Sequence, residues 1–143
     1  MIDPATNQRT GVATAVSVLS AIYAATFFCG ALLHLGVRIP LGFSVIAEPT
    51  IIPATFVEGL CGLALAVAAL AAFTHKSWAW TAAFAAHAFA LGGVLLGITA
   101  LAVGAGPSTE LNTIYHRVMV VALAAVLTLL LSPAGRTAFQ RAA

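Results

Sequence analysis

Four long apolar stretches fill most of this 143-residue chain, and they constrain its fold more than any other feature. A helix needs about 20 apolar residues to cross the hydrocarbon core of a bilayer, and each stretch is long enough. Helices are expected because backbone amides among lipid tails must pair within their own segment, and because the stretches lack the alternation of β-barrel strands. The predicted spans are residues 12–36, 50–74, 78–103 and 109–131.

The composition agrees with a membrane location. Hydrophobic residues make up 62% of the chain and charged residues 7%, with a mean hydropathy of +1.06, so the chain lacks the polar surface that a soluble domain of this length needs. We therefore predict an all-α integral membrane protein, a four-helix transmembrane bundle that forms one domain over residues 1–143. The net charge of +2 gives no support for nucleic-acid binding. The expected partners are the lipid bilayer and other membrane subunits or further copies of the chain.

The basic residues between and beyond the spans predict the orientation. Cytoplasmic connections of membrane proteins carry an excess of Lys and Arg. Arg38 and Arg117 fall on one side of the bundle, and the remaining basic residues fall on the side of both termini: Arg9, Lys76, Arg136 and Arg141. Both termini are therefore predicted to be cytoplasmic, in a multi-pass protein of a bacterial inner membrane. The first span is too long for the h-region of a signal peptide, which has about 7–15 residues, and it is expected to be retained.

Each span carries one ionisable side chain that a membrane interior should resist: His34, Glu58, His87 and His116. Such residues face the bundle interior and often mark functional sites. His34, Glu58 and His116 are expected in the outer half of the membrane, and His87 near the midplane. A charged carboxylate facing lipid costs about 2.5 kcal/mol or more, so Glu58 should turn inward and be protonated or paired. Its candidate partners are His34, His116 and Arg117.

A first hypothesis for the function is a binding site in the outer half, formed by Glu58 with His34, His116 and Arg117. Such a site can take a proton, a metal ion or the head group of a quinone-like lipid. The two imidazoles and the carboxylate are suitable ligands for a divalent transition metal. A bis-histidine haem requires His87 to face another histidine at equal depth. The alternative for His87 is a single interhelical hydrogen bond outside the site.

Two further hypotheses come from other classes. The chain can be a structural accessory or assembly subunit of a membrane complex, or it can be a homo-oligomeric transporter or channel with Glu58 as the coupling residue. No motif names a reaction, so whether the chain is an enzyme stays open. Cys29 and Cys61 have no CxxC partner and are expected to be small core residues. The apolar connection 37–49 is expected to lie on the membrane surface or to cap the bundle.

Two segments resemble the DoxX-like small membrane proteins. They are Gly30-Ala-Leu-Leu-His-Leu-Gly36, at the end of the first span, and Phe56-Val-Glu-Gly-Leu-Cys-Gly-Leu-Ala-Leu-Ala-Val, at the start of the second. The resemblance implies a four-helix membrane subunit associated with redox or oxidative-stress complexes, with Glu58 at the position of the family's helix-two glutamate. The segment Asn112-Thr-Ile-Tyr-His-Arg117 does not belong to that pattern.

Overall fold

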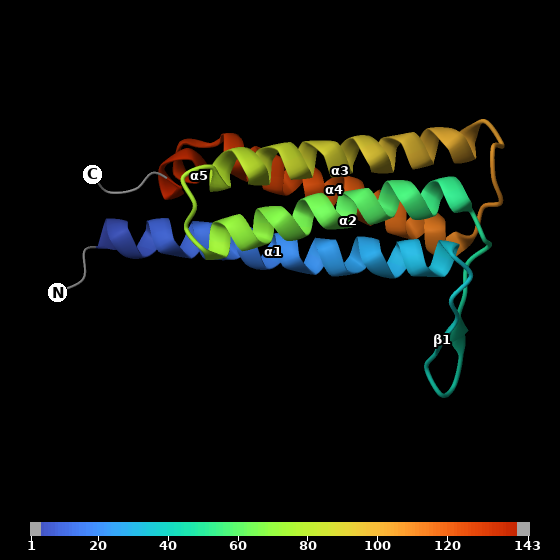
Figure 1. The fold of residues 1–143 in the computed structure, drawn as a ribbon. Coiled ribbons are helices and arrows are strands. Elements are labelled where there is room, and N and C mark those ends of the chain that lie inside the picture. The colour runs from blue at the N-terminus through green and yellow to red at the C-terminus, as the bar shows by residue number, and fades with distance from the viewer. Residues whose placement is uncertain (1–3, 140–143) are drawn as a thin grey trace.

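The protein forms a bundle of long helices with a small hairpin at one end (Figure 1). The computed structural model describes residues 4–139, with side chains from residue 11 onward, so the side chain of Arg9 and the whole of Arg141 lie outside the described part. The elements follow in this order: α1 (Pro4–His34), β1 (Ile39–Pro40), β2 (Val45–Ile46), α2 (Ile52–Phe73), α3 (Ala79–Ala102), α4 (Glu110–Leu131) and α5 (Pro133–Ala138).

The predicted all-α four-helix bundle is confirmed. Four helical segments are long and apolar enough to cross a membrane, and their ends agree closely with the predicted spans: Gly11–His34, Ile52–Phe73, Ala79–Ala102 and Glu110–Leu131. The outward faces of these helices carry large apolar side chains, such as Ile22, Phe56, Leu70 and Val121, all exposed. A surface of this kind is stable against lipid tails and costly in water.

Local signals in the sequence set the helix ends. Pro53 lies in the first turn of α2, where its missing N–H has no helical partner. Thr109 caps α4 by accepting a hydrogen bond from the backbone N–H of Asn112 at 3.1 Å. Ser132 ends α4 and caps the short helix α5, which the sequence analysis did not predict. After α1, the chain turns at Gly36, whose φ of 97° favours glycine.

Helices adjacent in the chain pack side by side, and α5 lies against α1 and α4 at the end of the bundle that holds both termini (Figure 1). We call this the terminal end. The core consists of small and branched side chains, and its largest fully buried members are Phe27, Leu65, Leu123 and Leu130. Between α1 and α2, the Ser17 hydroxyl donates to the carbonyl oxygen of Ala69 at 3.0 Å.

The opposite end, which we call the hairpin end, carries the two-stranded sheet β1–β2. Ile39 pairs with Ile46 in antiparallel register, and the hairpin extends sideways, roughly perpendicular to the helices (Figure 1). Phe43 at its tip is 91% exposed. The expectation that this connection caps the bundle is therefore wrong, because short pairing strands carry it away from the helix ends; its location on the membrane surface stays a prediction.

Candidate functional site

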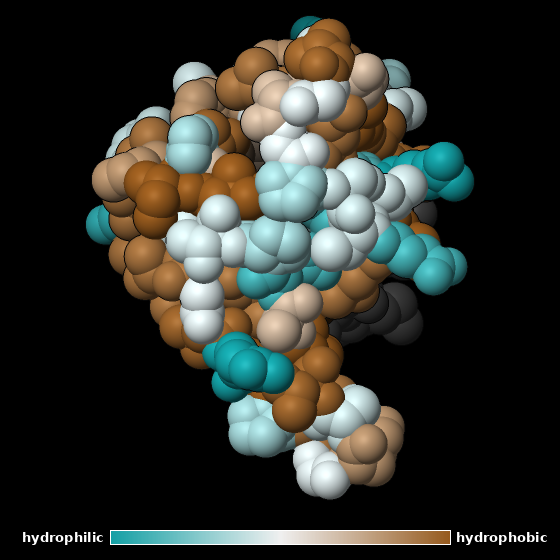
Figure 2. Space-filling view, turned by 90° about the vertical axis from the view of Figure 1, so that its right-hand side faces the viewer, coloured by the Kyte–Doolittle hydropathy of each residue, from teal (hydrophilic) through white to brown (hydrophobic). Residues whose placement is uncertain are grey.

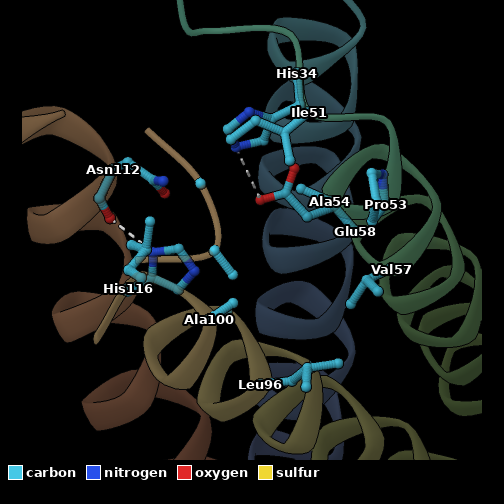
Figure 3. A pocket seen from close by; sticks show the side chains of 15 residues that line it. His34, Ile51, Pro53, Ala54, Val57, Glu58, Leu96, Ala100, Asn112 and His116 are labelled. Atoms are coloured by element: carbon cyan, nitrogen blue, oxygen red, sulfur yellow. Dashed lines mark hydrogen bonds and ion pairs between the residues drawn. The ribbon is translucent and has the colours of Figure 1, made fainter. Parts of the chain in front are cut away.

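A cavity of about 270 Å³ opens between α2, α3 and α4 near the hairpin end, with the last turn of α1 on its wall. Its walls consist of small and apolar side chains and four buried polar ones: His34, Glu58, Asn112 and His116. Figure 3 shows these polar groups arriving from three helices. Seen from the hairpin end, hydrophilic residues gather around the middle of the face, and hydrophobic residues cover most of its sides (Figure 2).

His34 and Glu58 form a buried pair across α1 and α2. Nε2 of His34 lies 4.0 Å from Oε1 of Glu58. Nδ1 of the same imidazole lies 3.1 Å from the carbonyl oxygen of Pro49, and because a carbonyl oxygen only accepts, Nδ1 carries a hydrogen and donates it. The ring is thereby held with Nε2 toward the carboxylate. The prediction that Glu58 turns inward and meets at least one of its candidate partners agrees with this arrangement.

The carboxylate of Glu58 lies directly on the backbone of α1 at Gly30. A Cβ at Gly30 would come within 2.7 Å of Oε2 and 2.9 Å of Oε1 of Glu58. Any side chain at this position would displace the carboxylate. Gly30 therefore provides the space in which Glu58 can reach His34.

His116 is placed on the other side of the cavity by the first turns of α4. Its Nδ1 lies 2.8 Å from the carbonyl oxygen of Asn112 and donates to it, as in the His34 ring. Its Nε2 lies against Gly97 of α3, where a Cβ would collide with the ring. A glycine thus accommodates His116 just as Gly30 accommodates Glu58.

Thr109 connects this wall to the base of the hairpin. Its hydroxyl donates to the carboxylate of Glu48, with the two oxygens at 2.7 and 2.8 Å, while it accepts the backbone N–H of Asn112. One hydroxyl therefore fixes the start of α4 and ties it to the connection that leads into α2.

Several buried polar atoms around the cavity have no hydrogen-bond partner among the described residues. Oε2 of Glu58 and Oδ1 of Asn112 are of this kind, and so is the hydroxyl of Tyr115, whose ring lies edge-on to that of His116 at 5.6 Å. Leaving a buried polar group unpaired costs about 1–3 kcal/mol. All three atoms are buried, and of the three residues only Glu58 and Asn112 line the cavity.

Two of the predicted site residues lie elsewhere. His87 does not line the cavity; it is fully buried, its Nδ1 donates to the carbonyl oxygen of Ala83 in its own helix at 2.7 Å, and its ring lies edge-on to Tyr23. The hydrogen bond predicted for it between helices is thus formed within α3. Arg117 is exposed on α4 and does not line the cavity either, because it follows His116 and points to a different face.

The structure also bears on the predicted metal ligands. Within residues 4–139, no three His, Cys, Asp or Glu side chains are close enough together to hold a metal ion. His34, Glu58 and His116 share one cavity but are not assembled as a metal-binding triad. Of the two cysteines, Cys61 is buried as expected, whereas Cys29 is exposed on α1.

The sequence analysis missed the roles of Gly30 and Gly97. Gly97 was not singled out there, and Gly30 was named only as the first residue of a segment that resembles the DoxX-like proteins. A signal was present, since each glycine lies on a helix face that is directed toward an ionisable residue of a neighbouring helix. Without the helix pairing, however, it cannot be told which side chain each glycine accommodates.

No family model matches the chain, and no curated protein or solved structure is significantly similar to it. The resemblance to the DoxX-like proteins stays a prediction.

Proposed function

We propose that the protein binds a small molecule with a polar head group inside the membrane, in the cavity at the hairpin end. The observation that carries this proposal is the Glu58 side chain, which is 6% exposed, lies 4.0 Å from Nε2 of His34 and lines the cavity. A buried carboxylate of this kind is expensive in a membrane protein and is usually kept for a function.

The size and lining of the cavity support a ligand of limited size. Pockets for drug-sized molecules measure about 300–1,000 Å³, and this cavity, at about 270 Å³, lies just below that range. Apolar residues such as Val57, Leu96 and Leu101 surround the four polar groups. A ring-sized head group therefore suits the cavity, as in a quinone-like lipid whose tail remains among the lipid tails.

The proposed setting is a bacterial inner membrane with both termini in the cytoplasm. The two termini, Lys76 and Arg136 belong to the terminal end, in agreement with an even number of spans. The cavity then opens in the outer half of the membrane. In a variant with both native cysteines replaced by Ala, Ser44→Cys should react with a membrane-impermeant maleimide in intact cells, and Ser77→Cys only after permeabilisation. Labelling of Ser77→Cys in intact cells would overturn this orientation.

An accessory role in a larger membrane complex is a second candidate. The observation that favours it is the projecting hairpin with its exposed Phe43, which offers an apolar contact beyond the bundle. This role does not need the polar cavity. Substitutions of Phe43 and of Glu58 therefore separate the two candidates: loss of a complex in Phe43→Ser, with Glu58→Gln unaffected, would favour the accessory role.

The experiment that tests the binding function is a comparison of small molecules that copurify with the protein. Wild type, Glu58→Gln and Gly92→Ala are purified in parallel in mild detergent, and bound molecules are extracted and quantified by mass spectrometry. Gly92 is the control because a Cβ there meets nothing within 4 Å. Wild type and Gly92→Ala should retain the same molecule, and Glu58→Gln should lose it at least tenfold, since hydrogen bonds to charged groups contribute about 1.5–3 kcal/mol. Equal amounts in all three preparations, or none in wild type, would sink the proposal.

A further inference from the structure

The hydrogens on the two imidazoles of the cavity are fixed by the backbone. Nδ1 of His34 donates to the carbonyl oxygen of Pro49, and Nδ1 of His116 donates to that of Asn112. In an uncharged imidazole with a hydrogen on Nδ1, the other nitrogen is an acceptor. Both histidines therefore present Nε2 as an acceptor on the cavity side, one beside Glu58 and the other beside Gly97.

The other polar side chains of the cavity add mainly acceptors. As a carboxylate, Glu58 accepts through Oε1, which faces Nε2 of His34, whereas its Oε2 is buried against Gly30. The lining contains no Lys, Arg, Ser, Thr, Tyr or Trp residue. Only the amide of Asn112 supplies side-chain N–H donors, and it also brings Oδ1, a further acceptor. With Glu58 ionised, the side chains of the cavity thus offer several acceptors and one donor group.

The spacing of the pair supports the same conclusion. Nε2 of His34 and Oε1 of Glu58 are 4.0 Å apart, which is longer than a direct hydrogen bond. Two acceptors at this separation can both be reached by one hydrogen-bearing group placed between them. Even where His34 and Glu58 share a proton, Nε2 of His116 and a second lone pair of Oε1 of Glu58 remain acceptors.

We propose that the ligand supplies the hydrogens: its head group donates at least two hydrogen bonds to Glu58, His34 and His116. This inference rests on the binding function proposed above and narrows its ligand class. Two kinds of molecule have the required chemistry, namely a ring with two hydroxyl groups and an amphipathic ammonium ion. Carbonyl-only rings such as quinones, and anions such as carboxylates or phosphates, bring further acceptors and leave those of the cavity unpaired.

The test compares ring probes of matched shape with the protein in lipid nanodiscs, by isothermal calorimetry. Durohydroquinone carries two hydroxyl donors, duroquinone has the same ring and methyl groups with two carbonyl oxygens, and the dimethyl ether of durohydroquinone has no donor. Durohydroquinone should bind at least tenfold more tightly than either of the others. Benzylammonium is the cationic probe. If it binds more tightly than durohydroquinone, the ligand is an ammonium ion; if durohydroquinone binds more tightly, the ligand is a neutral ring with two hydroxyl groups.

Glu58→Gln sharpens the test because it replaces an acceptor by an amide that also donates, with little change in shape. The ratio of the affinities for durohydroquinone and duroquinone should fall at least tenfold in Glu58→Gln and stay unchanged in Gly92→Ala. Equal or tighter binding of duroquinone by wild type overturns the inference and leaves the cavity a binding site. Failure of all four probes overturns the inference as well, and the copurification experiment then decides separately whether the binding function falls with it.

Discussion

The two ends of the bundle differ in how their buried polar side chains are hydrogen-bonded. Toward the terminal end, the hydroxyl of Ser20 donates to the carbonyl oxygen of Val16, and the indole N–H of Trp80 donates to that of Leu130. Toward the hairpin end, Glu58 and Asn112 line a cavity, and each has a buried oxygen without a partner among the described residues. The bundle therefore has a packed half, in which these hydroxyl and indole groups are paired, and an open half, which contains the cavity.

This contrast separates structural polar residues from candidate functional ones. A side chain that donates its hydrogen to a nearby carbonyl oxygen contributes to packing and helix association. That donor is then not available to a ligand. His87 is an intermediate case, because its Nδ1 donates to Ala83 and its Nε2 has no partner among the described residues, yet His87 does not line the cavity. An unpartnered atom alone does not make a site; its side chain must also line a cavity.

The largest expected effect is on stability, in the packed half. Leu123→Ala should lower the free energy of unfolding by about 2–5 kcal/mol, because Leu123 is fully buried and its removal leaves a void. Leu96→Ala is the control, since Leu96 lines the existing cavity and is 59% exposed. Thermal unfolding in detergent measures both. Equal losses in the two variants would erase the contrast between the halves.

The next effect is on ligand binding, in the open half. Gly97→Ala should weaken binding of the copurified molecule at least tenfold, because the added methyl group displaces His116, and Gly30→Ala should do the same by displacing Glu58. Gly92→Ala and Gly59→Ala are the matched controls, since an added Cβ at either position meets nothing within 4 Å. If all four variants bind the molecule equally well, the space at Gly30 and Gly97 is not needed for the site.

His87 tests the intermediate case. His87→Gln should leave the affinity for the ligand within about twofold of wild type and lower stability by about 1 kcal/mol, the size of one net hydrogen bond. The reason is that His87 does not line the cavity and donates its hydrogen bond within its own helix. Titration of ligand into the purified variant, together with thermal unfolding, checks both values. A tenfold loss of affinity would return His87 to the functional site.

The smallest effect is expected for a saturated hydroxyl. Ser17→Ala removes the hydrogen bond to Ala69 between α1 and α2 and should cost about 0.6 kcal/mol, the average for such bonds in membrane proteins. Thr26→Ala is the control, because that hydroxyl is exposed and bonds only to Ile22 of its own helix. Unfolding measured on both variants in the same detergent resolves the difference. A loss above 2 kcal/mol for Ser17 would mean that the packed half depends on single polar bonds.

The helices were predictable from sequence because length and hydropathy are local properties. The spans agree closely with the structure, and the inward turn of Glu58 followed from the cost of a carboxylate among lipid tails. Its choice of His34 over Arg117 could not be predicted, because this depends on helix rotation. Arg117 follows His116 directly, and successive residues of a helix point to faces about 100° apart.

The hairpin and the hydrogen positions were beyond the sequence for another reason. Strand pairing between Ile39 and Ile46 depends on a turn of few residues, whereas the apolar character of the segment fits a surface loop equally well. Likewise, the assignment of Nδ1 in His34 as a donor needs the carbonyl oxygen of Pro49, which approaches only once α1 and α2 are paired. Contacts of this kind arise from tertiary packing rather than from local pattern.

The sideways direction of the hairpin also restricts how molecules of this protein can associate. The hairpin leaves the bundle on the side of α1 (Figure 1), so it projects beyond that flank at the hairpin end. A neighbouring helix bundle that approaches this flank meets Phe43 before it can pack along the full length of α1. The hairpin therefore limits how closely a second bundle can pack along the α1 flank at the hairpin end.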